Sequence, residues 1–182
     1  MTATQQSFAQ RMIGAAKLDV ETYEEVEHDE SATSQAAIVV AIVAVCAAIG
    51  GAGGGGAGII AGPISALAGW LLWSGVTYFI GTRVFKGVAT WGELLRTLGF
   101  AQSPGVLMLL SGLGFIGGLL SAAAGIWMLI AGLIAIRQAL DVGTAEALIT
   151  AFLGWLSYVA VAIVVGLLFG VQAAMLSSLG LG

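Results

Sequence analysis

The side chains best suited to metal or acid–base chemistry stand in an acidic stretch near the N-terminus. Glu25 and His28, the only histidine, have the Glu-x-x-His spacing of carboxylate di-iron bundles. Such a centre needs more carboxylates on facing helices, and the rest of the membrane domain offers only Glu93, Asp141 and Glu146. We therefore expect no metal and no cofactor, and interpret the stretch as a solvated acidic face or a docking surface for a basic partner. The alternative, a metal site, predicts bound metal that is lost in His28→Ala.

A partner-binding role follows from the spacing of the charges in this stretch. If it is helical, one face carries Glu21, Glu24, Glu25 and His28. Further upstream, Phe8, Met12 and Ala16 repeat at helical spacing, which predicts a short amphipathic helix on the inner membrane surface. The candidate partner-binding residues are Tyr23, Glu24, Glu25, Glu27, His28 and Asp29.

Catalytic classes are excluded by the residue types that the sequence lacks. With one histidine and one cysteine, Cys46, the chain cannot assemble a zinc site or a nucleophilic triad of standard composition. The polar residues within the apolar segments form no nucleophile–base pair. No charge falls at mid-membrane depth, where one would mark an ion or proton pathway. We therefore expect that the protein is not an enzyme.

The elements that position these residues follow from a composition that suits lipid rather than water. Of the 182 residues, 59% are hydrophobic, 9% are charged and 28 are glycine. Soluble domains are about 25% charged, so this chain cannot supply a polar surface. The formal net charge of -4 leaves no basic surface for nucleic acid. These values exclude a soluble enzyme, a nucleic-acid-binding domain and a disordered tail, and indicate a multi-spanning protein in contact with membrane lipids.

The predicted fold is all-α: a polytopic integral membrane protein with a compact five-helix transmembrane bundle and a short amphipathic and acidic N-terminal arm. The arm comprises residues 1–35, and the five-span membrane domain comprises residues 36–182. Each span is an apolar run of helical length, or close to it. The predicted spans are residues 36–49, 59–80, 104–120, 123–136 and 147–176.

The basic residues predict an orientation. With five spans, the arm, a polar loop at residues 81–103 and the connection at 137–146 share one side, and they carry all six Lys and Arg residues. The glycine-rich loop at residues 50–58, a tight turn at 121–124 and the tail share the other side. By the positive-inside rule the N-terminus is cytoplasmic and the C-terminus is outside. The expected location is the bacterial inner membrane.

Small residues spaced four apart predict close packing of helices in lipid. Internal packing of the bundle is the favoured interpretation, and an interface with another membrane protein or a second copy is the alternative. The helix-packing pairs are Gly58 with Gly62, Gly114 with Gly118, and Gly166 with Gly170.

The sequence resembles bacterial members of the Yip family, the Rab/Ypt-interacting membrane-domain proteins. The resemblance rests on the acidic stretch from Tyr23 to Asp29 and on Gly99, Phe100 and Pro104, which are similar to the family's Gly-aromatic-xxx-Pro motif. It implies five spans and a cytoplasmic N-terminus. In eukaryotic members it implies roles in membrane trafficking through binding of Rab GTPases and other family members, although the arm here is shorter than theirs.

Two functions are compatible with these observations. The leading hypothesis is a non-enzymatic membrane scaffold or accessory subunit whose arm docks a cytoplasmic partner and whose helices pack against itself or another membrane protein. The alternative is a channel or transporter for a small uncharged or lipid-like solute, which the glycine content and Pro63 within the second span favour.

Overall fold

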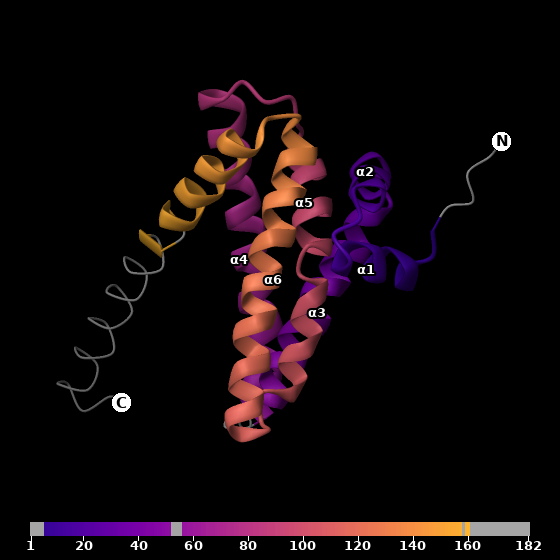
Figure 1. The fold of residues 1–182 in the computed structure, drawn as a ribbon, viewed down its shortest axis with the longest axis vertical. Helices are drawn as coiled ribbons and strands as arrows, with labels where there is room; N and C mark the ends of the chain where they lie inside the picture. The colour runs from indigo at the N-terminus through magenta and orange to yellow at the C-terminus, as the bar shows by residue number, and fades with distance from the viewer. Residues whose placement is uncertain (1–5, 52–55, 158, 161–182) are drawn as a thin grey trace, which may run out of the picture.

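The computed structural model describes residues 6–51, 56–157 and 159–160, and within them helices are joined by turns and short connections, with no strand (Figure 1). Residue 144 begins a further helix, Thr144–Ser157, on the C-terminal side of the named elements. The predicted all-α class is therefore confirmed for these residues. The named helices are α1 Phe8–Ala16, α2 Val20–His28, α3 Ala32–Gly50, α4 Gly56–Val84, α5 Trp91–Phe100, the 3-10 helix η1 Ser103–Leu110 and α6 Gly114–Leu140.

Among the described residues, three helices are long and apolar enough to cross a membrane. They are α3, the part of α4 from Gly62 to Val84, and α6. Thr144–Ser157 is apolar but shorter, and the predicted fifth span at 147–176 runs on beyond the described residues. The membrane-spanning character is thus supported, and the count of five spans stays a prediction.

The predicted third span, 104–120, and the tight turn at 121–124 are wrong. Residues 103–110 form η1, the chain reverses at residues 111–113, and α6 then runs unbroken through 121–124. Gly114 begins α6 with φ 59°, a backbone angle that glycine adopts without the strain a Cβ would bring. The run Ser121–Ala124 is rich in alanine, the best helix former, and continues the helix instead of breaking it.

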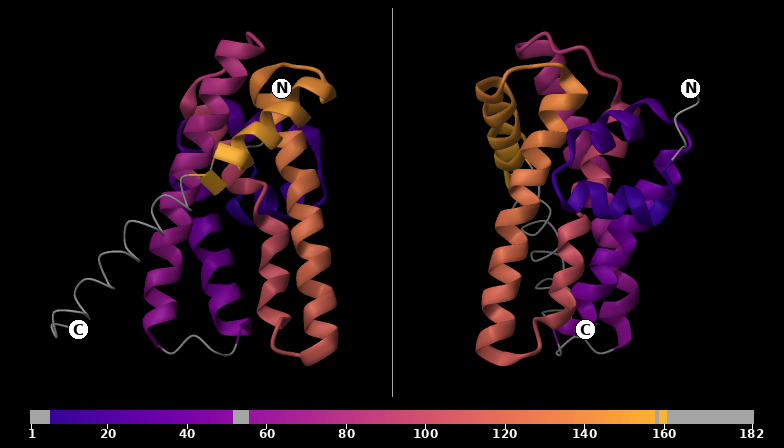
Figure 2. Two further views of the ribbon diagram at one scale, coloured as in Figure 1. Left: turned by 90° about the vertical axis from the view of Figure 1, so that its left-hand side faces the viewer. Right: turned by 45° about the vertical axis from the view of Figure 1, so that its right-hand side comes forward.

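Two hairpins make up the membrane part of the fold. α3 and α4 form the first, while η1 and α6 form the second, and both reverse at the end opposite the arm (Figure 2). η1 packs between α3 and α6: a Cβ on Gly105 would lie 2.5 Å from Val43 Cγ1 and 2.7 Å from Met128 Sδ. Gly105 therefore allows η1 to approach both helices more closely than any larger residue would.

The polar loop predicted at residues 81–103 is largely helical. α4 continues to Val84, and α5 begins at Trp91 after a capping box in which Thr90 Oγ1 accepts from the Glu93 backbone and Glu93 Oε2 accepts from the Thr90 backbone. Such a reciprocal cap satisfies backbone donors that the first helical turn leaves unpaired. Residues Leu94–Phe100 are all buried, so α5 is a central element and not a surface loop.

The arm is folded against the bundle instead of standing apart from it. The amphipathic helix predicted upstream is α1, the acidic stretch is also helical as α2, and both lie beside α5 (Figure 1). Tyr23 and Val26 are fully buried. Phe8 contacts Phe100 edge to face, with ring centroids 6.4 Å apart. The apolar face of α1 thus meets protein, and Ile13 on its other face is exposed.

Candidate docking arm and its supporting contacts

Arg11 holds the three N-terminal helices together from a buried position. Its Nη2 lies 2.8 Å from Glu25 Oε1 and 2.6 Å from Asp29 Oδ2, and Nη1 donates to Gln35 Oε1 at 3.1 Å. The arginine side chain is only 1% exposed, so loss of either carboxylate would leave a poorly compensated charge. The cluster therefore fixes α1 and α2 against the start of α3.

Asp29 also organises the turn between α2 and α3. Its Oδ1 accepts from Ser31 Oγ at 2.6 Å and from the Ser31 backbone N–H at 3.0 Å. The Ser31 hydroxyl bond, together with the Arg11 guanidinium and against the opposing effect of burial, lowers the pKa of Asp29 to about 2. Asp29 is therefore ionised whenever the arm is folded at neutral pH.

Arg96 of α5 performs a similar task at the C-terminal end of α2. Its Nε donates to the backbone carbonyl oxygens of Val26 at 3.0 Å and Glu27 at 2.9 Å, and Nη2 also donates to Glu27. The last carbonyls of a helix have no intrahelical partner and carry the negative end of its dipole. A buried guanidinium there satisfies these acceptors and joins the arm to the core.

The carboxyl group of Glu27 is buried where its ionised form is unfavourable. Its side chain is 8% exposed and forms no ion pair with any residue that the structure describes. Burial, with the nearby carboxylates of Glu93, Asp141 and Glu24 and against the lowering effect of His28, raises the pKa of Glu27 to about 7. The proton on Glu27 is therefore linked to the packing of α2.

Tyr23 is part of the inner face of α2. The side chain is fully buried, and its hydroxyl donates to the Ala15 carbonyl oxygen at 3.1 Å. Burial raises the pKa of Tyr23, so the phenol stays neutral. Its contacts hold α2 against the end of α1.

The outer face of α2 presents only part of the predicted partner-binding set. Glu24 and His28 are exposed, as is Glu21, whereas Tyr23, Glu25, Glu27 and Asp29 engage the protein itself. Glu24 Oε1 accepts from Gln138 Nε2 at 3.1 Å, and His28 Nδ1 lies 2.8 Å from the Glu24 carbonyl oxygen. The arrangement can present carboxylates to a partner; no group of residues able to hold a metal ion occurs in the described part of the chain.

Gly99, Phe100 and Pro104 form the junction between α5 and η1. A Cβ on Gly99 would lie 2.6 Å from Ala36 Cβ, so the glycine lets α5 cross α3 at close range. Phe100 is fully buried against the arm, and the buried Pro104 stands in the first turn of η1. These three residues therefore connect the arm to the membrane helices.

The glycines predicted to pack helices together have different environments. A Cβ added to Gly62 would lie 4.0 Å from the Ala44 backbone oxygen of α3, whereas a Cβ on Gly114 or Gly118 would meet nothing within 4 Å among the described residues. The internal packing expected for Gly114 and Gly118 is thus not seen there.

The other predicted packing glycines are not tested by these contacts. Gly58 lies in α4, near its first residue. Gly166 and Gly170 both lie outside the described residues, which end at residue 160. Close packing at Gly166 and at Gly170 therefore stays a prediction.

Polar groups on the membrane helices form no catalytic pair in the described part of the chain. Trp73 Nε1, Thr77 Oγ1 and Thr150 Oγ1 are buried without a hydrogen-bond partner there, as is Ser74 Oγ. Trp73 and Thr77 face Gly154 of the Thr144–Ser157 helix. They pack at a helix contact, with no base beside a hydroxyl.

Sequence reasoning missed the two residues that hold the arm, Arg11 and Arg96. Both count simply as basic residues on the inner side when only charge is considered. One local signal was present: Thr90 and Glu93 have the spacing of a capping box, which predicts a helix carrying Arg96. No local signal tells which backbone carbonyls that arginine meets.

These features define a helical membrane protein whose amphipathic N-terminal arm is fastened to its spans by buried arginines. The Yip1 domain matches residues 20–165, which cover α2 to the Thr144–Ser157 helix and include the Gly99–Pro104 junction. The chain therefore belongs to the Yip1 domain family, and the resemblance noted in the sequence is confirmed. Comparison with curated proteins and with solved structures gives no significant match.

Proposed function

We propose that this Yip-type membrane protein is a non-enzymatic scaffold or accessory subunit that docks a basic partner on α2. The observation that carries the proposal is the two-sided construction of that helix. Its inner side is fixed by Arg11, Arg96 and Tyr23, while its outer side leaves Glu21 and Glu24 exposed. A rigid helix that presents carboxylates loses little conformational entropy when a partner binds.

The proposed location is the bacterial inner membrane, with the arm in the cytoplasm. The arm-side end carries Arg83, Lys86 and Arg137, whereas the described residues of the two hairpin reversals carry no Lys or Arg. This charge distribution supports the orientation through the positive-inside rule. Partners can then be cytoplasmic proteins, other membrane proteins or a second copy. No observation in the described residues favours the channel or transporter hypothesis over this one.

The test is capture of partners by the tagged, membrane-extracted protein. The double variant Glu21→Gln/Glu24→Gln removes two exposed charges without touching the Arg11 cluster, and we expect it to lose the partner that the wild type retains. A charge-matched control, Glu30→Gln/Glu146→Gln, removes two carboxylates away from α2 and should retain the partner. Equal capture by the wild type and both variants would refute a docking role for α2.

A further inference from the structure

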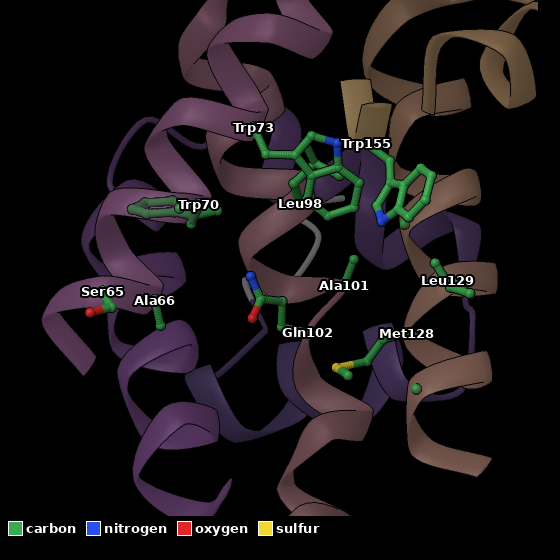
Figure 3. A pocket seen from close by; sticks show the side chains of 13 residues that line it. Ser65, Ala66, Trp70, Trp73, Leu98, Ala101, Gln102, Met128, Leu129 and Trp155 are labelled. Atoms are coloured by element: carbon green, nitrogen blue, oxygen red, sulfur yellow. The ribbon is translucent and has the colours of Figure 1, made fainter. Parts of the chain in front are cut away.

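A cavity of about 340 Å³ lies between α4 and α6 (Figure 3). Trp70 and Trp73 of α4 line one side, and Met128 of α6 lines the other. The floor is formed by Leu98 and Ala101, which are 1% and 2% exposed. The volume is within the range of about 300–1,000 Å³ that is usual for small-molecule sites.

The mouth of this cavity faces the membrane and not water. Both walls belong to candidate spans, from Ser65 to Trp73 on α4 and from Gly125 to Gly132 on α6. Leu129 and Trp155 at the rim are exposed on the outside of the bundle. Since none of the lining residues is charged, the cavity suits an uncharged, mainly apolar occupant.

The depth of the cavity matches one lipid leaflet. Trp73 and Gly132 stand at one end, and Gly132 is roughly 27 Å along α6 from its first residue, so this end lies near the headgroup layer on the arm's side. Gly125 at the other end is roughly 16 Å along α6 from its first residue, about half of a hydrocarbon core of about 30 Å. The cavity therefore extends from the arm-side interface to about the middle of the bilayer.

Gln102 brings a polar group into the middle of the cavity, and Trp73 Nε1 at its arm-side end is also without a hydrogen-bond partner among the described residues. The Gln102 side-chain amide points into the space in Figure 3 and makes no hydrogen bond within the described part of the chain. An amide without a partner is unfavourable next to hydrocarbon. A lipid whose acyl chain enters the cavity brings its ester carbonyls, which are hydrogen-bond acceptors, to the arm-side end.

From this geometry we propose that the cavity binds one acyl chain of a phospholipid from the leaflet on the arm's side. The chain lies between α4 and α6, with its ester end beside Trp73 and Gly132 and its tail at Gly125. The three indole rings of Trp70, Trp73 and Trp155 supply apolar contact along its length. The site is independent of the docking face of α2, because no residue of α2 lines it.

The experiment uses the full chain reconstituted in vesicles of phosphatidylethanolamine and phosphatidylglycerol. A trace of phosphatidylglycerol carries a photoreactive diazirine on one acyl chain, and mass spectrometry locates the crosslinks after illumination. Lipid that only surrounds the bundle cannot reach the buried Leu98 and Ala101. We therefore expect crosslinks on Leu98, Ala101 and Met128 in addition to the outer surface.

Gly125→Phe is the blocking variant. Gly125 lines the cavity and meets nothing within 4 Å, so the ring fits and occupies the space of the tail. If the ring displaces two methylene groups, crosslinking at Leu98 and Ala101 should fall roughly tenfold. Gly118→Phe is the matched control, because Gly118 also lies on α6 with open space but does not line the cavity. It should crosslink like the wild type.

The outcomes separate the proposal from its competitors. Absence of crosslinks at Leu98 and Ala101 in the wild type would overturn the proposal. That result is expected if another segment of the chain fills the cavity. Equal crosslinking in Gly125→Phe and Gly118→Phe would also overturn it. Gly125→Leu provides the same test with a smaller side chain if the phenylalanine variant fails to fold.

Discussion

The guanidinium of Arg96 donates to the backbone carbonyl oxygen of Glu27, with Nε 2.9 Å from that oxygen, although 69 residues separate them. Arg96 lies on α5, at the centre of the protein, and Glu27 is in the last turn of α2. The bond places a permanent positive charge at the negative end of a helix dipole. It joins the acidic arm to the membrane helices through the backbone, so the outer side chains of α2 stay available.

Arg96→Met should release α2 while the membrane helices remain folded. The substitution leaves the end carbonyls of α2 unpaired, and a hydrogen bond to a charged group contributes about 1.5–3 kcal/mol. The measurement is amide hydrogen exchange in detergent, where we expect residues 20–28 to lose protection and α6 to keep it. Arg83→Met is the control, since Arg83 is exposed at the end of α4. Unchanged protection of α2 would contradict the role of Arg96.

The local structure of the arm could be predicted from sequence, whereas its attachment could not. The spacing of Phe8, Met12 and Ala16 predicted a helix that is present as α1, and the acidic stretch, whose helical face was considered only as a condition, forms α2. Burial of Arg11 depends on carboxylates 14 and 18 residues away, and burial of Arg96 on a helix 69 residues away. Periodicity reports which face of a helix is apolar, not which distant backbone groups a charge will meet.

The apolar segments show a second limit of sequence reasoning. Hydropathy correctly found apolar runs, but a uniform run does not tell where the chain reverses. The pattern around Gly114 and the pattern at Ser121–Ala124 are equally apolar, and only the positive φ of Gly114 marks the real turn. η1 is a 3-10 helix where an α-helical span was predicted, and Gly105 lets it fit closely between α3 and α6.

Gly99→Ala should destabilise the crossing of α5 over α3. The added methyl group would lie 2.6 Å from Ala36 Cβ, and overpacking of this kind costs about 1–3 kcal/mol. We expect a lower melting temperature by tryptophan fluorescence in detergent. Ala36→Gly in the same chain removes the opposing methyl and should restore part of the loss, which a double-mutant cycle measures. Gly118→Ala meets open space and should gain up to about 1 kcal/mol from helix propensity.

The raised pKa of Glu27 predicts that the arm packs more tightly in mild acid. Its pKa in the folded protein is about 7 against an ordinary 4.5, so the folded arm binds the proton more tightly than the unfolded arm. Its contribution to stability is therefore greatest below pH 4.5, falls as the pH rises to 7, and is constant above that. The melting temperature measured across this range should decline with pH.

Glu27→Gln is the matched variant for this pH dependence, because glutamine imitates the protonated carboxyl. We expect the variant to melt at a nearly constant temperature between pH 4.5 and 6.5. His28, whose pKa is raised by its bond to the Glu24 carbonyl, adds a decline of the same sign as the pH rises further. Asp29 acts in a separate window, since its stabilisation is lost only as the pH falls from 3.8 towards 2. A variant with the full slope of the wild type would exclude Glu27 as its source.

The final prediction concerns which ends of the helices face the cytoplasm. Lys17 follows α1 of the arm, Gly112 lies in the η1–α6 reversal, and both are exposed. In a Cys46→Ala background, Lys17→Cys should react with a membrane-impermeant thiol reagent only after the cells are opened, because the positive-inside rule places the arm in the cytoplasm. Gly112→Cys should react in intact spheroplasts. The reverse pattern would show an inverted protein, and reaction of both under one condition would show that the passes through α3, α4 and η1 do not bring the chain to the opposite side of the bilayer.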